Sequence, residues 1–411
     1  MLKPGTIIKT KDKIITINSF IAEGGQGEVW LGTEQYTNKK VAVKLFNKLP
    51  KDDAAFQQNT KKRIEYLISL KLQNNIKTVE APQYVVEFDN RIGYSSNYID
   101  NAIQLNELLE DKDKMSFFRY TDLLIIAQQI VISVMALHER GLFHGDLSTT
   151  NVLIRRDKND SDVYEIFFID LDNYGTNKKN IIPNPICLGQ EFYLAPEIRK
   201  NIVKTPDLQT DFYSLAIILH ELLLVTHPAY GNDNDPESFL KAMTSGWIKD
   251  PILSSSQSSG LSVRILNPEF VNLFRRGLDN KPEARPSAKE WLSAIEESFE
   301  DVYECPKCFY PFINHSGLRA CPSCAQNFPT YKFTDKSGNQ IVAFEKALTE
   351  ISRDLLGSPR VSKYHATVTR RGIELRLKIN PNNTNKTSRY TANKWFELPN
   401  TDKLKPLIIE R

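Results

Sequence analysis

The chain has 411 residues, with 41% apolar and 25% charged side chains and a formal net charge of +3. This length is enough for two or three domains of roughly 100–200 residues each. The composition excludes collagen-like, wholly disordered and disulfide-scaffold proteins, and the near balance of 53 basic and 50 acidic residues argues against nucleic acid as a partner. Because the N-terminus lacks the apolar core of a secretory signal, we expect a cytoplasmic location.

The predicted elements divide into a strand-rich start and a helical body. Apolar and polar residues alternate over residues 1–50, which predicts strands and hairpins, and a helix is expected at 54–72. Further helices are expected at 121–140, 212–225 and 287–299. The most apolar stretch, 123–137, is shorter than a membrane span of about 18 residues, so we expect a buried helix and no membrane partner. These elements predict an α+β fold with two lobes.

A glycine cluster and a lysine in the strand-rich start are typical of phosphate binding. Glycines in Ala22-Glu-Gly-Gly-Gln-Gly-Glu-Val29 let backbone N–H groups approach phosphates, although a plain hairpin turn has the same composition. Lys44 ends the apolar segment Val-Ala-Val-Lys and can hold nucleotide phosphates as a point charge. Glu65 best matches a helical carboxylate that orients this lysine, with Glu80 and the pair Asp52–Asp53 as alternatives.

Two further motifs supply oxygen-rich side chains. His144-Gly-Asp-Leu-Ser-Thr-Thr-Asn151 follows the helix expected at 121–140, and Phe167-Phe-Ile-Asp170 comes after it. Asp146 can accept a proton from an attacking hydroxyl, while Asn151 and Asp170 are ligands suited to Mg²⁺. Phosphoryl transfer needs little beyond such positioning and charge neutralisation.

With these motifs in this order, the chain resembles the eukaryotic-type protein kinase family over roughly residues 12–298. The resemblance implies that Lys44 contacts the phosphates of ATP and pairs with Glu65, that Asp146 is the catalytic aspartate, and that Asn151 and Asp170 hold Mg²⁺. It also implies a hinge beside adenine at 94–99, with Ser96 as a small gatekeeper. The full set of implied nucleotide-binding residues is Gly24, Gly25, Gly27, Val29, Lys44, Ser96 and Tyr98.

Later motifs favour a protein kinase over the related small-molecule phosphotransferases such as choline kinases. Gly189-Gln-Glu-Phe-Tyr-Leu-Ala-Pro-Glu197 resembles the end of a protein-kinase activation segment. Asp211 resembles the helical aspartate that supports the catalytic loop, and Arg285 is expected to pair with Glu197. We therefore expect protein substrates and transfer to Ser/Thr hydroxyls, with small-molecule transfer as the alternative.

Three departures from the family pattern bear on activity. Asp170-Leu-Asp172 replaces Asp-Phe-Gly, so the glycine of that motif is lost. Ser148 replaces a lysine that helps to neutralise the transferred phosphoryl group, which keeps a nucleotide-binding pseudokinase scaffold open as an alternative. Gly145 replaces the arginine that grips a phosphorylated activation segment, so we expect activity that does not strictly require phosphorylation there.

Four of the five cysteines form two Cys-x-x-Cys turns, Cys305-Pro-Lys-Cys308 and Cys321-Pro-Ser-Cys324, separated by 12 residues. Four thiolates at this spacing suit tetrahedral Zn²⁺, and the segment resembles a zinc ribbon. Disulfides or a redox pair are disfavoured in a cytosolic chain. Because all four positions are cysteine, the pattern predicts a structural site without an open catalytic position.

The strand-rich end resembles the forkhead-associated (FHA) domain, which binds phosphothreonine. The resemblance rests on Ile351-Ser-Arg353, on Val361-Ser-Lys-Tyr-His365 and on Asn385-Lys-Thr387. A phosphate reader needs a guanidinium and hydroxyl donors, which Arg353 and Ser362 can supply, and the resemblance implies that Asn385 holds the peptide backbone. A β-sandwich without a phosphate site is the alternative.

We thus predict three domains. A protein kinase domain spans 1–298, with an N-lobe at about 1–100 and a C-lobe at about 101–298. A zinc ribbon spans 299–328, and an FHA-like β-sandwich spans 329–411. The predicted cofactors are ATP, Mg²⁺ and Zn²⁺, and the predicted partners are protein substrates and phosphothreonine-containing proteins.

Overall fold

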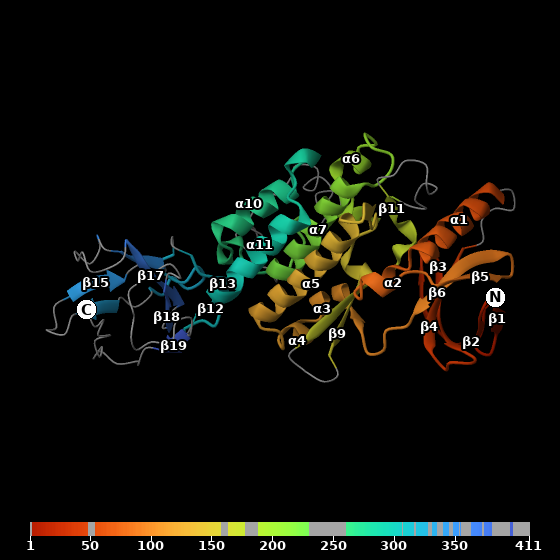
Figure 1. Ribbon diagram of the computed structural model, residues 1–411, viewed down its shortest axis with the longest axis horizontal. Helices are drawn as coiled ribbons and strands as arrows, with labels where there is room; N and C mark the ends of the chain where they lie inside the picture. Colours follow the sequence, from red (N-terminus) through yellow and green to blue (C-terminus); the bar gives the residue numbers. More distant parts are fainter. Residues whose placement is uncertain are drawn as a thin grey trace. The chain divides into compact units, whose positions relative to one another are not determined.

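The structure is a computed structural model, shown in Figure 1. It describes residues 2–47, 54–157, 163–176, 188–229, 260–305, 307–315, 318–327, 331–334, 340–344, 348–352, 354, 363–371, 374–379 and 395–397. The chain divides into two compact units. The first contains Met1–Gly260 and Leu273–Ile295, and the second contains Leu261–Asn272 and Glu296–Arg411.

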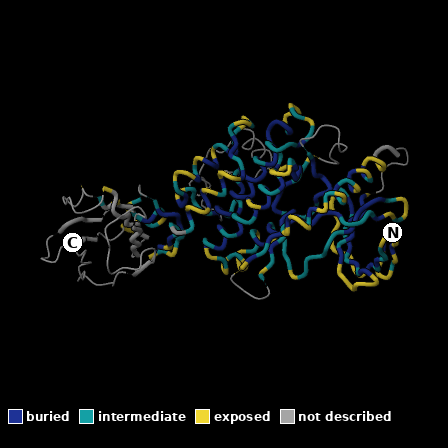
Figure 2. Tube along the Cα trace, viewed as in Figure 1, coloured by how far each residue is buried: buried dark blue, intermediate teal, exposed yellow. Residues whose placement is uncertain are grey.

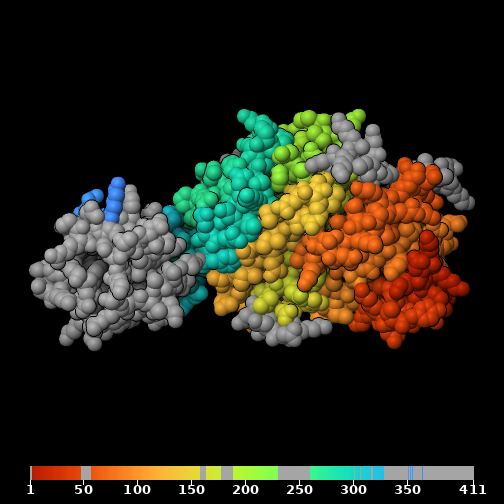
Figure 3. Space-filling model, in the orientation of Figure 1, coloured from red at the N-terminus to blue at the C-terminus, as the bar shows by residue number. Residues whose placement is uncertain are grey.

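An antiparallel sheet forms the N-terminal part of the first unit, and its strand order is β1-β2-β3-β4-β6-β5. The strands are β1 (Ile7–Lys9), β2 (Ile14–Gly24), β3 (Gly27–Glu34), β4 (Lys40–Phe46), β5 (Tyr84–Phe88) and β6 (Arg91–Asn97). Because side chains alternate along a strand, Val41, Val43 and Leu45 enter one apolar cluster while Phe46 enters another on the opposite face. Figure 3 shows these strands as a continuous mass of red and orange atoms.

Helix α1 (Ala54–Leu70) packs against β5 and β6 on the face that contains Phe46. Its Ile64 is fully buried with Phe46, Ile92 and Tyr94. Lys44 lies on this same face of β4, two residues before Phe46. The sheet and helix therefore direct Lys44 and Tyr94 toward the helical part of the unit.

The helical part is built around α5 (Tyr120–His138) and α7 (Leu208–Leu224), which pack against each other in Figure 1. Asp207 caps α7 by accepting hydrogen bonds from Gln209 N and Thr210 N, and Val225 ends it in the left-handed region at φ 52°. Figure 2 shows buried residues running through this part of the chain. By length and composition alone α5 could cross a membrane, but most of its apolar stretch is buried in the fold.

Further helices in the part of the chain that the structure describes are α2 (Leu72–Asn75), α3 (Leu105–Glu110), α4 (Lys112–Met115), α6 (Pro196–Arg199), α10 (Pro268–Gly277) and α11 (Ala288–Ser298). Short strands form two small sheets, β7 (Ile103–Gln104) with β9 (Val152–Arg156) and β10 (Tyr164–Phe168), and β8 (Leu142–Phe143) with β11 (Gly175–Thr176). These strands frame the loops that contain Asp146 and Asp170. The helices that we expected at 54–72, 121–140, 212–225 and 287–299 are confirmed as α1, α5, α7 and α11.

The first strands of the second unit are β12 (Val302–Glu304) and β13 (Pro311–Ile313), which pair antiparallel as a hairpin. Strands β14 (Tyr331–Thr334) and β15 (Gln340–Phe344) pair with each other. An antiparallel sheet follows in the order β16 (Leu348–Ser352), β17 (Tyr364–Arg371), β18 (Glu374–Ile379) and β19 (Trp395–Glu397). The strand-rich end is confirmed, while the β-sandwich and the three domain boundaries stay predictions.

Candidate active site

Lys44 lies at the centre of a buried cluster of charged and polar groups. Its Nζ is 3.2 Å from Asp170 Oδ2 and 3.2 Å from Asp172 Oδ2. Burial by itself would lower the pKa of Lys44, but the charges of Asp172 and Asp170 raise that pKa above its ordinary value. Lys44 is therefore a permanent cation, which suits a group that holds phosphates.

The structure corrects the prediction that Lys44 pairs with Glu65. Glu65 is exposed, and no ion pair joins it to Lys44 within the described residues. Helix α1 buries Arg63, Ile64 and Leu67 instead, so a residue one position after Ile64 is turned outward. Of the alternatives, Glu80 accepts a hydrogen bond from Asn97 Nδ2 at 2.8 Å, and residues 52 and 53 lie outside the described residues.

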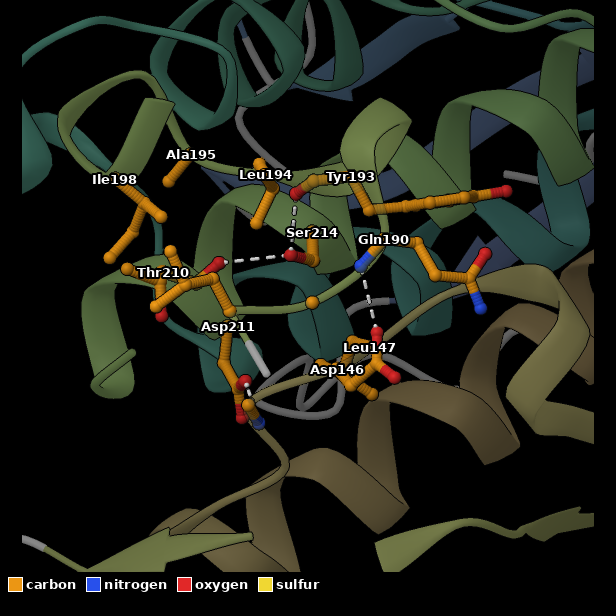
Figure 4. Close-up of a pocket in the computed structure, with 13 residues that line it drawn as sticks. Asp146, Leu147, Gln190, Tyr193, Leu194, Ala195, Ile198, Thr210, Asp211 and Ser214 are labelled. Atoms are coloured by element: carbon orange, nitrogen blue, oxygen red, sulfur yellow. Dashed lines mark hydrogen bonds between the residues drawn. The ribbon is translucent and has the colours of Figure 1, made fainter. Parts of the chain in front are cut away.

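Asp146 lies in the loop after β8 and faces Gln190, as Figure 4 shows. The backbone N–H of Gln190 donates to Asp146 Oδ1 at 2.9 Å. Burial raises the pKa of Asp146 to about 7, and the charge of Asp172 acts in the same direction. A carboxylate with a pKa near neutrality is well matched to accepting a proton from a hydroxyl.

Asp211 of α7 holds the loop that contains Asp146. Its carboxylate accepts hydrogen bonds from His144 N at 2.7 Å and Gly145 N at 2.9 Å, and His138 Nε2 lies 3.0 Å away. The predicted support of the loop by Asp211 is therefore confirmed. Gly145 has φ +73°, and a Cβ at this position would lie 2.7 Å from Asn173 O. Glycine is thus required here by backbone geometry.

Asn151 and Asp170 have the donor set that Mg²⁺ prefers. Asn151 Nδ2 donates to Asp146 O at 2.8 Å, and its backbone O accepts from Ile169 N at 3.0 Å, which ties the two loops together. The amide nitrogen of Asn151 is thus engaged by Asp146 O, which leaves its side-chain oxygen as the group that could bind a cation, and the Asp170 side chain is 36% exposed. The residues fit the metal.

The glycine-rich turn joins β2 to β3. A Cβ added to Gly24 or Gly25 would meet nothing within 4 Å, so packing alone does not require glycine there. At Gly27 a Cβ would lie 2.1 Å from Leu45 O, so this glycine serves the close approach of β3 to β4. Val29 of β3 pairs with Lys44 of β4, and Ser96 of β6 pairs with Ala42 of β4. Tyr98 N donates to Lys40 O at 3.3 Å just after β6.

Sequence reasoning placed Tyr94 in the hinge beside adenine and missed both its contact with the aspartates and the membership of Asp172 in the site. The Tyr94 hydroxyl lies 3.3 Å from Asp170 Oδ1 and 3.4 Å from Asp172 Oδ1. The alternation of β6 was a usable signal, because Tyr94 and Ser96 share a face and Tyr94 is opposite Lys44. For Asp172 the only sequence signal was that an acid replaces the glycine of the Asp-Phe-Gly motif.

A pocket lies beside Asp146, between the loop that contains Asp146 and the first turns of α7 (Figure 4). Its apolar lining comes from Leu147, Leu188, Leu194, Ala195 and Ile198. Gln190, which also lines it, donates through its side-chain amide to Ser148 Oγ at 2.9 Å and to Thr150 Oγ1. Neutral hydrogen bonds therefore join the segment 188–195 to the loop that contains Asp146.

Arg285 and Glu197 form a buried ion pair. Arg285 Nη1 and Nη2 each donate to a different carboxylate oxygen of Glu197 at 2.7 Å, and Nη1 also donates to Gln209 O at 2.8 Å. The guanidinium lies 5.0 Å from the centre of the Tyr213 ring. This predicted pair is confirmed, and it fixes the end of the segment 188–197 to the residues that precede α11.

The four cysteines of the second unit converge as their spacing predicted. Their sulfur atoms all lie within 4.8 Å of one another, with Cys305 and Cys321 buried. The shortest sulfur–sulfur distances are 3.7 Å, for Cys305 with Cys324 and for Cys308 with Cys321, so these are free thiols. Four thiols in this arrangement fit tetrahedral Zn²⁺.

The three predicted phosphopeptide-binding residues, Arg353, Ser362 and Asn385, lie outside the described residues. Their neighbours on β16 and β17 belong to the four-stranded antiparallel sheet. The phosphothreonine reader therefore stays a prediction.

Comparison with known proteins gives a family match over most of the chain up to residue 295. A family model described as "Protein kinase domain" matches residues 15–295, more than half of the chain. The relative called Serine/threonine-protein kinase TIO, from Arabidopsis thaliana, is 27% identical over 290 residues, which cover 69% of this chain and 19% of the relative.

Two further relatives differ in how much of their length is matched. The Putative serine/threonine-protein kinase R436 from Acanthamoeba polyphaga mimivirus is 26% identical over 277 residues, covering 67% of this chain and 91% of that protein. The Serine/threonine-protein kinase Nek9 from Xenopus laevis is 25% identical over 221 residues, covering 51% of this chain. The chain spans only about a fifth of the length of Nek9 and TIO, with 21% and 19% matched.

Proposed function

Because the chain belongs to the protein kinase domain family, we propose that it transfers the γ-phosphoryl group of ATP to serine or threonine hydroxyls of protein substrates. The observation that carries this proposal is the convergence of Lys44, Asp146, Asn151 and Asp170 on one site within a single compact unit. A scaffold that only bound nucleotide would need Lys44, Asn151 and Asp170, but it would have no need of Asp146, which acts on the acceptor hydroxyl. We also propose a cytoplasmic location, which rests on the sequence expectation alone.

Each residue has a distinct part in the proposed reaction. Lys44 holds the phosphates of ATP, and Asp146 orients the acceptor hydroxyl and takes its proton. Asn151 and Asp170 would hold Mg²⁺, which supplies positive charge to the phosphates when bound. The segment Gly189–Glu197, which resembles the end of a protein-kinase activation segment, supports a polypeptide substrate over a free metabolite.

The test compares Asp146→Asn with the wild type in a γ-labelled ATP assay with a protein substrate. We expect transfer to fall by about 10²- to 10⁴-fold while binding of Mg²⁺–ATP persists, since the lost group acts on the acceptor. Asp113→Asn, an exposed aspartate of α4, serves as the matched control and is expected to retain activity. Equal transfer by Asp146→Asn and the wild type would refute the enzyme proposal and favour a nucleotide-binding scaffold, and transfer only to small molecules would favour the small-molecule alternative.

Two further proposals concern the second unit. We propose that Cys305, Cys308, Cys321 and Cys324 hold a structural Zn²⁺, because their sulfurs are already gathered without disulfides. We also propose that the strand-rich end binds phosphothreonine peptides, as the FHA resemblance implies. Binding of such a peptide that persists after Arg353→Ala would contradict the proposed reader site.

A further inference from the structure

The anionic partner of Lys44 must come from outside helix α1. Within Ala54–Leu70 the only acidic residue is Glu65, and it is exposed. The inner face of α1 carries Arg63, which is 1% exposed and donates to the backbone oxygen of Tyr174. The buried face of the helix therefore carries the positively charged Arg63, whereas the kinase resemblance implied a glutamate facing Lys44.

Asp172 has the geometry of that missing partner. Its side chain is 1% exposed, and both carboxylate oxygens lie within hydrogen-bond distance of Lys44 Nζ, at 3.3 and 3.2 Å. The Tyr94 hydroxyl, 3.4 Å from Asp172 Oδ1, closes the same cluster from β6. A carboxylate this deeply buried needs a paired cation, because an unpaired charge is costly in the interior.

The two acids near Lys44 have different freedom to take other partners. Asp170 is 36% exposed and is the residue that would meet Mg²⁺, whereas Asp172 has almost no contact with solvent. Once Asp170 is committed to the metal, Asp172 remains the carboxylate that neutralises and directs Lys44. The next residue, Asn173, donates to Gly145 O at 3.0 Å, so the turn that contains Asp172 is also fixed to the loop of Asp146.

From these contacts we propose that Asp172 is the positioning residue of Lys44, taking the place of a helical glutamate. This inference rests on the proposed kinase function only for its effect on catalysis. The placement of Lys44 then depends on the 3₁₀ turn Leu171–Asn173 and is independent of any carboxylate on α1. Arg63 fixes α1 to the same segment through the backbone of Tyr174.

The test uses Asp172→Asn, which keeps the side-chain shape, with Glu65→Gln as the matched control. We expect kcat/KM for ATP to fall by about 100-fold in Asp172→Asn, the scale of loss when a binding group is misplaced, with KM for ATP raised. Glu65→Gln should stay within about twofold of the wild type, since an exposed carboxylate contributes little to a distant cation. Asp172→Glu, which retains the charge, should recover part of the loss.

A double-mutant cycle separates positioning from a general structural role. In a Lys44→Met background, Asp172→Asn should cause no further loss of Mg²⁺–ATP affinity, because it acts through the lysine. Equal losses in both backgrounds, or equal behaviour of Asp172→Asn and Glu65→Gln, would overturn the inference.

A second cycle, on urea unfolding midpoints, does not depend on catalysis. The shift of Lys44→Met/Asp172→Asn should be smaller than the sum of the single shifts, whereas Lys44→Met and Glu65→Gln should be additive. Additivity of the Lys44 and Asp172 changes would overturn the pairing. If the wild type neither binds Mg²⁺–ATP nor transfers phosphate, the kinase proposal fails, and this unfolding cycle still decides the pairing.

Discussion

Removing Arg285 should destabilise the first unit more than removing any exposed arginine. The Arg285 side chain is fully buried and that of Glu197 is 7% exposed, so Arg285→Met leaves an uncompensated carboxylate in the interior. Breaking a buried pair in this way costs about 3–5 kcal/mol. The variant also loses the hydrogen bond to Gln209 O and the contact with the Tyr213 ring, which place the expected loss at the upper end.

The assay is thermal unfolding of the full chain, with Arg276→Met as the matched control. Arg276 pairs with Glu290 at 2.8 Å, but the two side chains are 36% and 44% exposed, and such a pair contributes about 0–1 kcal/mol. At about 2–4 °C per kcal/mol, Arg285→Met should lower the melting temperature by about 10–20 °C, and Arg276→Met by about 4 °C at most.

A third variant identifies the buried charge as the cause. Adding Glu197→Gln to Arg285→Met removes the unpaired carboxylate and should recover part of the melting temperature, because a neutral amide is less costly to bury. Equal melting temperatures for Arg285→Met and Arg276→Met would refute the reasoning. The reasoning would also be refuted if adding Glu197→Gln to Arg285→Met lowered the melting temperature by as much as Glu197→Gln lowers that of the wild type.

Three other predictions follow from the structure. Burial lowers the pKa of His220 to about 4, so the unfolded chain binds a proton below about pH 6.5 that the folded chain takes up only near pH 4. Relative to His220→Gln, the free energy of unfolding of the wild type, measured in urea, should therefore fall by about 3 kcal/mol between pH 6.5 and pH 4. Parallel pH profiles of the two proteins would contradict this. Metal analysis should find about one Zn²⁺ per chain that Cys308→Ser abolishes and Cys187→Ser retains, and equal zinc content in both variants would rule out the site. Phosphatase treatment should leave kinase activity within about twofold, because Gly145 offers no cation for a phosphate; loss of activity that phosphorylation of Thr176 restores would show the reverse.

The order and chemistry of the catalytic motifs could be read from the sequence because each motif is local. Asp146, Asn151 and Asp170 lie in short loops next to strands, and the turns that place them involve few residues on either side. The Arg285–Glu197 pair and the support by Asp211 join distant positions, yet they too were predictable, since the family resemblance links these motifs as a set. The Cys-x-x-Cys spacing likewise determined which four side chains gather.

The partner of Lys44 was decided only by the tertiary structure. Which residues of α1 face inward depends on the rotation of that helix, and burial of Ile64 and Leu67 against the sheet turns Glu65 outward. A single acid on a helix gives no periodic signal of its direction, so sequence pattern alone assigned it to the lysine. Packing across β4, β6 and the turn after β10 instead brings Lys44, Tyr94 and Asp172 together, because those contacts join residues up to 128 positions apart in the chain.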